Sequence, residues 1–268
     1  MKNQVFFAQL VKPVIGMIHL LPLPGSAGYD GQGLEPVIAH ALSEGRALEA
    51  GAVDAILLQN TGDLPAFGDG GPETIAYMSM IGTLLRRELK TPLGVNILAN
   101  GTESALAVAH AIGARFVRIK VYVGAVVGLG GITQGSAQRA QDYLRHLAPI
   151  DLEICADVYD RTSRPLVDMP IEEAANYASY HGRAQALVVT GASVPDSLDR
   201  IRKVKTTVKD KPIYVGGGAT AENIAEFFQV CDGVIVASSV KRGPAFQGVT
   251  DRDLLARFMD AADRARRA

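Results

Sequence analysis

Seven polar residues end or directly follow short apolar runs, which is where the strands of a parallel sheet present side chains to a ligand. They are His19, Gln59, Asn60, Asn96, Lys120, Asp157 and Thr190. An imidazole or a carboxylate can move a proton, an ammonium group can neutralise a developing oxyanion, and amides or hydroxyls can orient a substrate. Together, these residues indicate a functional site better than any one of them does alone.

Structural alternatives exist for individual members of this set. His19 would also suit a packed histidine that hydrogen-bonds a neighbouring carbonyl, and Asp157 would suit an N-cap or a loop anchor. Lys120 is harder to explain structurally, because strand alternation in "RFVRIKV" points it into the interior together with Arg118. We expect Arg118 to be a structural, salt-bridged residue below the site, with Glu153 as its partner.

Two glycine- and serine-containing stretches predict an anion site. "VGGGATAENI" (215–224) supplies Gly216, Gly217 and Gly218, and "ASSVKRG" (237–243) supplies Ser238 and Ser239. Glycines let the backbone approach a ligand, and hydroxyls add hydrogen-bond donors. A tight turn with Thr220 as N-cap is the alternative for the first stretch. Lys241 and Arg242 are expected as exposed loop residues that either add charge or are merely solvated.

The elements that would position these residues are eight apolar runs, each followed by a stretch of helical periodicity. The expected strands are 14–19, 55–59, 93–97, 116–121, 152–157, 186–190, 213–216 and 233–237, and the expected helices are 35–50, 73–89, 103–112, 137–147, 171–181, 196–208, 221–229 and 252–267. Eight such units in a chain of 268 residues predict an α/β fold, a single (β/α)₈ TIM barrel spanning 1–268. "VFFAQLV" (5–11) would be a short extra N-terminal segment, and an open doubly wound sheet is the alternative fold.

In a barrel, the anion-binding stretches would follow the seventh and eighth strands, where many barrels bind phosphate. Two longer loops, 61–73 and 123–135, are expected to cover the mouth as lids, the second almost without charge. Asp63 and Asp69 in the first loop are expected to be solvated turn carboxylates, so the sequence predicts no metal site and no cofactor.

Composition excludes several classes of protein. A formal net charge of −1 argues against nucleic-acid binding. The apolar stretch near the N-terminus is too short and too interrupted to span a membrane, so any membrane association would be peripheral. Cys155 and Cys231 lie in apolar segments without metal-type spacing, which predicts buried free thiols and a cytoplasmic location.

Several motifs resemble those of the BtpA/SgcQ family of (β/α)₈-barrel proteins. They are "VIGMIHLLPLPG", "QNTGDLPAF", "GVNIL", "ADVYDRTSRPL", "ALVVTG", "GGGATAENI" and "DGVIVASSVKRG", which together extend from about Pro13 to about Arg242. The resemblance implies a phosphate-binding barrel without a settled activity. One of the family's names comes from a protein implicated in photosystem I biogenesis, and many relatives are found near sugar-metabolism genes.

The chain departs from the family pattern at specific positions. Gln59 stands where relatives usually carry a glutamate, and 127–131 replaces a stretch that usually contains an aspartate. Asp160 and Arg161 stand where relatives tend to have a basic residue and a histidine. An amide in place of a carboxylate keeps the shape but removes general-base capacity, which favours a retained ligand site over retained catalysis.

Three hypotheses follow from these observations. The first is a barrel that binds a small phosphorylated metabolite, such as a sugar phosphate, as a lyase or isomerase. In that scheme, His19 or Asp157 moves a proton, Lys120 neutralises charge and Asn96 orients the substrate. The second is a non-catalytic biogenesis or stability factor for photosystem I or another membrane complex. The third is a homo-oligomer whose mouth binds a regulatory anion, since soluble barrels commonly assemble as homo-oligomers.

Overall fold

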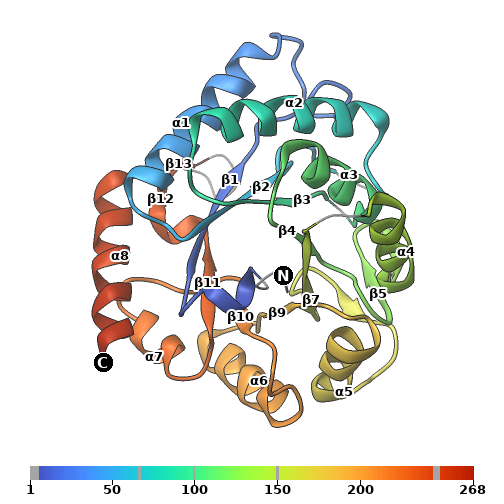
Figure 1. Cartoon of the computed structure of the whole chain (residues 1–268), viewed down its shortest axis with the longest axis vertical. Helices are drawn as coiled ribbons and strands as arrows, with labels where there is room; N and C mark the ends of the chain where they lie inside the picture. The colour runs from blue at the N-terminus through green and yellow to red at the C-terminus, as the bar shows by residue number, and fades with distance from the viewer. Residues whose placement is uncertain (1–5, 66–67, 99, 149–150, 244–247) are drawn as a thin grey trace.

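In the computed structural model, eight parallel strands close into a barrel surrounded by helices (Figure 1). The structure describes residues 6–65, 68–98, 100–148, 151–243 and 248–268. Around the barrel the strands follow the order β1, β11, β10, β9, β7, β4, β3, β2, so each strand pairs with its neighbours in the chain and the last pairs with the first. The predicted (β/α)₈ fold is confirmed.

The barrel strands agree with the apolar runs to within one or two residues at their ends. They are β1 (Val14–His19), β2 (Ala55–Gln59), β3 (Leu93–Asn96), β4 (Phe116–Ile119), β7 (Glu153–Val158), β9 (Ala186–Val189), β10 (Ile213–Val215) and β11 (Gly233–Val236). The helices that follow them are α1 (Glu35–Ala50), α2 (Pro72–Glu88), α3 (Thr102–Ile112), α4 (Ala137–Leu147), α5 (Ile171–Asn176), α6 (Val194–Thr207), α7 (Ile224–Phe228) and α8 (Arg252–Arg267).

Some elements differ from the sequence-based expectation. The segment expected as one helix over 171–181 is α5 followed by a π-helical turn, η2 (Tyr177–His181). Helix α7 begins three residues late because the Asn223 side chain holds the preceding loop, accepting from the Thr220 N–H at 2.7 Å and donating to the Gly218 carbonyl at 2.9 Å. Thr220 is therefore not the N-cap, and Asn223 precedes the first helical residue.

The chain also forms small antiparallel sheets that the periodicity does not predict. β5 (Ala125–Gly128) pairs with β6 (Gly131–Gln134) as a hairpin, and β8 (Arg164–Pro165) adds to the other edge of β5. β12 (Lys241–Arg242) pairs with β13 (Val249–Thr250) after the last barrel strand. The uncharged loop expected as a lid is therefore an ordered hairpin.

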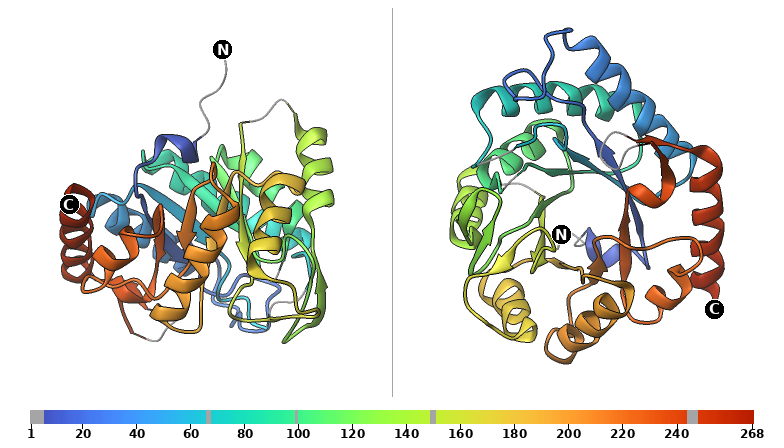
Figure 2. Two further views of the ribbon diagram at one scale, coloured as in Figure 1. Left: turned by 90° about the horizontal axis from the view of Figure 1, so that it is seen from below. Right: turned by 180° about the vertical axis from the view of Figure 1, so that it is seen from behind.

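The N-terminal segment closes the opposite end of the barrel from this hairpin (Figure 2). Phe7 begins a 3₁₀ turn, η1 (Phe7–Gln9), and the rings of Phe6 and Phe7 pack against Phe116. Glu153, at the start of β7, accepts hydrogen bonds from the backbone N–H groups of Phe6 and Phe7. The expected pairing of Glu153 with Arg118 is wrong, because Glu153 lies at the N-terminal end and serves the extra segment instead. Val5, the first residue of the expected segment, lies outside the described residues.

Two hydrophobic cores follow from the alternation of side chains along the strands. Residues such as Val117 and Ile119 of β4 point outward and pack in the layer between sheet and helices. Phe116 points inward and joins the core inside the barrel, which Cys155 also joins. Alternation therefore directs Arg118 inward as predicted. Both cysteines are buried and free, also as predicted.

A buried ion pair fixes the segment that follows β11. Lys241 Nζ lies 2.5 Å from Glu44 Oε2 of α1, and both side chains are only 3% exposed. Glu44 also accepts from the backbone N–H of Thr250 at 2.7 Å. Burial by itself would raise the pKa of Glu44, but Lys241 and Thr250 outweigh it and hold the pKa below its ordinary value. The expectation that Lys241 is exposed is therefore wrong, whereas Arg242 is exposed and pairs with Asp251.

Within the described ranges, no helix is both long and apolar enough to cross a lipid bilayer.

Replacing Lys241 tests the buried pair. Lys241→Met should lower the free energy of unfolding by about 3 kcal/mol, because it leaves the Glu44 carboxylate buried without its cation. The double variant Glu44→Leu with Lys241→Met should recover part of that loss. The matched control is Arg242→Met, which removes an exposed, solvent-screened pair and should cost much less. Urea unfolding measures all three, and equal losses for Lys241→Met and Arg242→Met would contradict the assignment.

Candidate functional site

A cavity of about 670 Å³ opens at the C-terminal ends of the barrel strands. Its wall combines strand ends with the loops that follow β2, β3, β4, β7, β10 and β11. From the sequence-predicted set, the lining includes His19, Gln59, Lys120, Thr190, Gly216, Gly217, Gly218, Ser238 and Ser239. Asn60, Asn96 and Asp157 are not part of this lining.

The loop after β10 presents its backbone to the cavity. Thr190 Oγ1 accepts a hydrogen bond from the Gly216 N–H at 3.2 Å, and the Asn223 side chain holds the loop from the other side. Gly218 has a φ of +84°, which favours glycine. Within the part of the chain that the structure describes, the N–H groups of Gly217, Gly218 and Ala219 make no hydrogen bond. They are available to a ligand in the cavity.

Gly216 is required by the close approach of its neighbours. A β-carbon at this position would lie 2.5 Å from Val188 Cγ1, 2.7 Å from Thr190 Oγ1 and 3.0 Å from Arg118 Nη2. Any larger residue would collide with this wall, so glycine is needed here for space. The same distances place the Arg118 guanidinium directly beside the glycine loop.

Arg118 is held by Asp157 in a bidentate ion pair. Arg118 Nε lies 2.8 Å from Asp157 Oδ1, and Nη2 lies 2.7 Å from Oδ2. Burial would lower the pKa of Arg118, but the Asp157 carboxylate outweighs it and raises the pKa above its ordinary value. Both carboxylate oxygens are thus committed to the guanidinium, which suits Asp157 to positioning Arg118 rather than to contact with a ligand.

Amide side chains connect the neighbouring strands behind the cavity wall. Gln59 Nε2 donates to Asn96 Oδ1 at 2.5 Å, and Asn96 Nδ2 donates to the Arg118 carbonyl at 2.8 Å. Gln59 Oε1 accepts from Thr61 Oγ1 at 3.2 Å. Gln59 therefore faces the cavity with an amide whose oxygen and one N–H already have partners, and Asn96 supports it from behind.

Asn60 and Asp63 hold the loop after β2. Asn60 Nδ2 donates to Asp63 Oδ2 at 2.9 Å, and Asn60 Oδ1 accepts from the Leu98 N–H at 2.8 Å. Asp63 also accepts from the Leu23 N–H at 2.8 Å and is buried. The expectation that Asp63 is solvated is therefore wrong, because its buried carboxylate accepts hydrogen bonds from Asn60 in its own loop and from Leu23 in the loop after β1. Residues 66 and 67 of this loop lie outside the described ranges.

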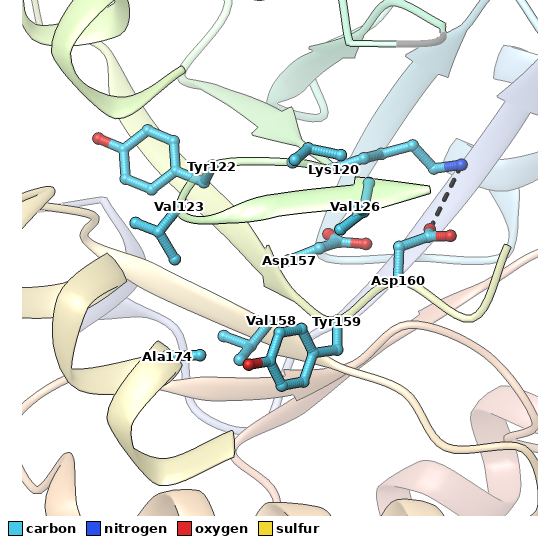
Figure 3. A pocket seen from close by; sticks show the side chains of 10 residues that line it. Lys120, Tyr122, Val123, Val126, Asp157, Val158, Tyr159, Asp160 and Ala174 are labelled. Atoms are coloured by element: carbon cyan, nitrogen blue, oxygen red, sulfur yellow. Dashed lines mark ion pairs between the residues drawn. The ribbon is translucent and has the colours of Figure 1, made fainter. Parts of the chain in front are cut away.

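Lys120 points toward Asp160 beside the hairpin (Figure 3). Lys120 Nζ lies 3.3 Å from Asp160 Oδ2 and 3.5 Å from Thr162 Oγ1. Burial would raise the pKa of Asp160, but Lys120 and the Thr162 donors outweigh it, so the pKa lies below its ordinary value. The cavity wall thus carries a partly exposed ammonium group that is paired with a carboxylate.

His19 ends β1 and is 6% exposed. Burial, followed by the positive charge of Lys241, lowers its pKa from 6.5 to about 4, while Glu44 acts in the opposite direction. Its backbone carbonyl lies 3.0 Å from His40 Nε2. The imidazole that lines the cavity is therefore neutral at pH 7.

Arg161 lines the cavity although no pattern in the sequence predicts a binding role for it. Its guanidinium atoms lie 3.7 to 3.8 Å from the place that a β-carbon on Gly217 would occupy, and the residue lines the cavity. Among the described residues, Arg161 has no ion-pair partner. Its position in the loop after β7 was the available signal, since that loop reaches the mouth of a barrel.

Among the described residues, no group of three or more histidine, cysteine, aspartate or glutamate side chains is arranged to hold a metal ion.

Comparison with known sequences identifies the relatives of this chain. A family model described as BtpA family matches residues 10–264. The chain is 35% identical to the photosystem I biogenesis protein BtpA of Synechocystis sp. over 94% of this chain and 88% of that protein. It is 28% identical to the putative sgc region protein SgcQ of Escherichia coli, over 96% of both. The resemblance expected from the motifs is confirmed.

Solved structures share the barrel at low sequence identity. N-(5'-phosphoribosyl)anthranilate isomerase from Pyrococcus furiosus superposes with a TM-score of 0.56 and 17% identity, over 94% of this chain and 99% of that one. At this identity, the similarity supports the fold alone.

The neutral His19 predicts a specific pH dependence of stability. Between pH 6.5 and pH 4 the unfolded chain binds a proton at this position that the folded protein does not bind, so the free energy of unfolding falls as the pH is lowered through that window. The contribution of His19 to this fall should be roughly 2 to 3 kcal/mol at pH 4.5.

Urea unfolding at pH 7 and pH 4.5 measures this contribution. The loss between the two pH values should be smaller for His19→Gln by the stated amount. His110→Gln, which replaces an exposed histidine, should lose as much as the unmodified protein. An identical loss for His19→Gln and the unmodified protein would show that His19 titrates normally.

Proposed function

The chain belongs to the BtpA family, and we propose that its barrel mouth binds a small phosphorylated metabolite of the sugar-phosphate class. The proposal rests on the position of Arg161. Among the described residues this side chain has no ion-pair partner, and it lies beside a glycine loop whose N–H groups are available. Guanidinium and backbone N–H groups are the donors that proteins use for phosphate. The Pyrococcus furiosus neighbour is an N-(5'-phosphoribosyl)anthranilate isomerase, and the phosphoribosyl group in its name agrees with this class.

Two loops would share the phosphate. Gly217, Gly218 and Ala219 would donate from the backbone, and Ser238 and Ser239 would donate from the loop after β11. Both loops are fixed, the first by Asn223 and the second by the Lys241 and Glu44 pair that follows it in the chain. Because the two loops are already fixed, they lose little conformational entropy when they bind a ligand.

The charged side chains that line the cavity leave one positive charge available to a bound phosphate. The lining contains three cations, Arg118, Lys120 and Arg161, and one carboxylate, Asp160. Asp160 pairs with Lys120, and Asp157 pairs with Arg118 from below. The charge of Arg161 therefore remains for the ligand, and a dianionic phosphate would supply its counter-ion.

If the protein is an enzyme, the groups that would touch the reacting atoms are His19 and Lys120. A neutral imidazole can accept a proton, and an ammonium group held by Asp160 can stabilise an oxyanion. These roles match a lyase or isomerase that moves a proton next to a carbonyl group. Asp157 and Asn96 would act as positioning residues, through Arg118 and Gln59.

A second candidate function is a non-catalytic biogenesis factor for a membrane complex, as the name of the Synechocystis relative suggests. Its structural support is a set of exposed apolar side chains outside the cavity, Ile132, Leu166 and Val167. In that case the protein would bind no phosphorylated compound and would co-purify with a partner complex.

Ser239 offers a charge test of the phosphate site. Binding of a phosphorylated sugar at about a hundredfold its Kd should raise the Tm by roughly 5 °C. Ser239→Asp should abolish this rise, because its carboxylate would repel the phosphate. Ser239→Asn is the matched neutral control and should keep most of the rise. A rise that survives in Ser239→Asp would place the ligand elsewhere.

Arg161 can be tested against a neighbour on the same loop. Arg161→Gln should weaken binding of inorganic phosphate and of ribose 5-phosphate about tenfold, since a charge-assisted contact is lost. Arg164→Gln, an exposed residue of β8 outside the lining, should leave both affinities unchanged. Isothermal titration calorimetry gives the affinities, and an equal effect of the two variants would indicate only a general electrostatic attraction.

A further inference from the structure

The cavity has two chemically different sides. In the closed strand order, β11 lies opposite β4 and β10 lies opposite β3. The glycine and serine loops follow β10 and β11, so the loops after β2, β3 and β4 form the wall across the barrel from the proposed phosphate position.

That opposite wall is mainly apolar. It presents Leu64 after β2, Leu98 after β3, and Val126 and Leu129 of the hairpin. Leu64 is 47% exposed and Leu129 is 85% exposed, although both line a cavity that reaches the polar strand ends. The hairpin from Ala125 to Gln134 contains no ionisable residue. The hydroxyl groups on this wall are those of Thr61 and Thr133, and Lys120 at its base is paired with Asp160, so leucine and valine side chains make up most of its upper part.

Polar side chains lie between the two sides. The strand ends at the bottom of the cavity present four polar side chains, those of His19, Gln59, Lys120 and Thr190. Moving across the cavity, a ligand would therefore meet anion donors, then hydrogen-bonding groups, then leucine and valine side chains.

We propose that the ligand is an organophosphate with an apolar substituent, in which a phosphate and a polar middle part are joined to an aryl or alkyl group that covers Leu64 and Leu129. This inference rests on the proposed phosphate site and specifies what the rest of the ligand must be. A concave site that combines a few polar groups with exposed apolar side chains is typical of small-molecule binding. Burying an apolar substituent against these leucines removes both surfaces from water, and each buried methylene strengthens binding about threefold to fourfold.

Two apolar residues of the hairpin differ in their position relative to the cavity. Leu129 lines the cavity, whereas Ile132, on the same hairpin and 62% exposed, does not. A small ligand would contact only the first of these residues. This difference provides a matched pair of variants.

The experiment is a calorimetric titration of the full chain with inorganic phosphate, methyl phosphate, butyl phosphate, hexyl phosphate and phenyl phosphate. Affinity should rise from methyl to hexyl phosphate by at least tenfold, and phenyl phosphate should exceed methyl phosphate. Leu129→Ser should lower the affinity for hexyl phosphate about fivefold or more without changing that for inorganic phosphate. Ile132→Ser should change neither.

The outcomes separate this inference from the proposed function. Equal binding of inorganic, methyl and hexyl phosphate would overturn the apolar subsite and leave the phosphate site standing. Equal losses in Leu129→Ser and Ile132→Ser would also overturn it, because a general effect of the hairpin surface would then explain the gain. Failure of every compound to bind would overturn both.

Discussion

The ion pair between Arg118 and Asp157 is the interaction on which the candidate site depends. It joins β4 to β7 inside the barrel, at 2.7 and 2.8 Å, with both side chains almost fully buried. The Arg118 carbonyl accepts from Asn96 of β3, and its guanidinium lies against Gly216 after β10. Four strands thus meet at one residue, through its side chain and its backbone carbonyl. An unpaired charge would be costly at this depth, so each partner requires the other.

The barrel itself could be predicted from the sequence because its signals are local and repeated. Apolar runs such as 14–19 and 55–59 alternate with helical stretches, and their bounds match the strands β1 and β2. The β5 and β6 hairpin could not be predicted in this way, since "AVVGLGGITQ" shows no alternation of apolar and polar residues. Lys241 was misjudged because its partner Glu44 lies 197 residues away in the chain.

The candidate site could be predicted only in part, and the reason is geometric. A polar residue at a strand end can either face the cavity, as His19 and Lys120 do, or support the wall from behind, as Asn96 does. Sequence position is the same in both cases, and only the hydrogen-bond partners distinguish them. Arg161 has no pattern of its own in the sequence, because its significance comes from a glycine 56 positions later that it approaches in space.

The N-terminal segment restricts the route by which a ligand can enter and leave the barrel. Phe6 and Phe7 cover the far end of the barrel, and residues such as Phe116 and Tyr214 fill its interior below the mouth. The cavity is therefore closed at the bottom, and a ligand must enter and leave through the barrel mouth.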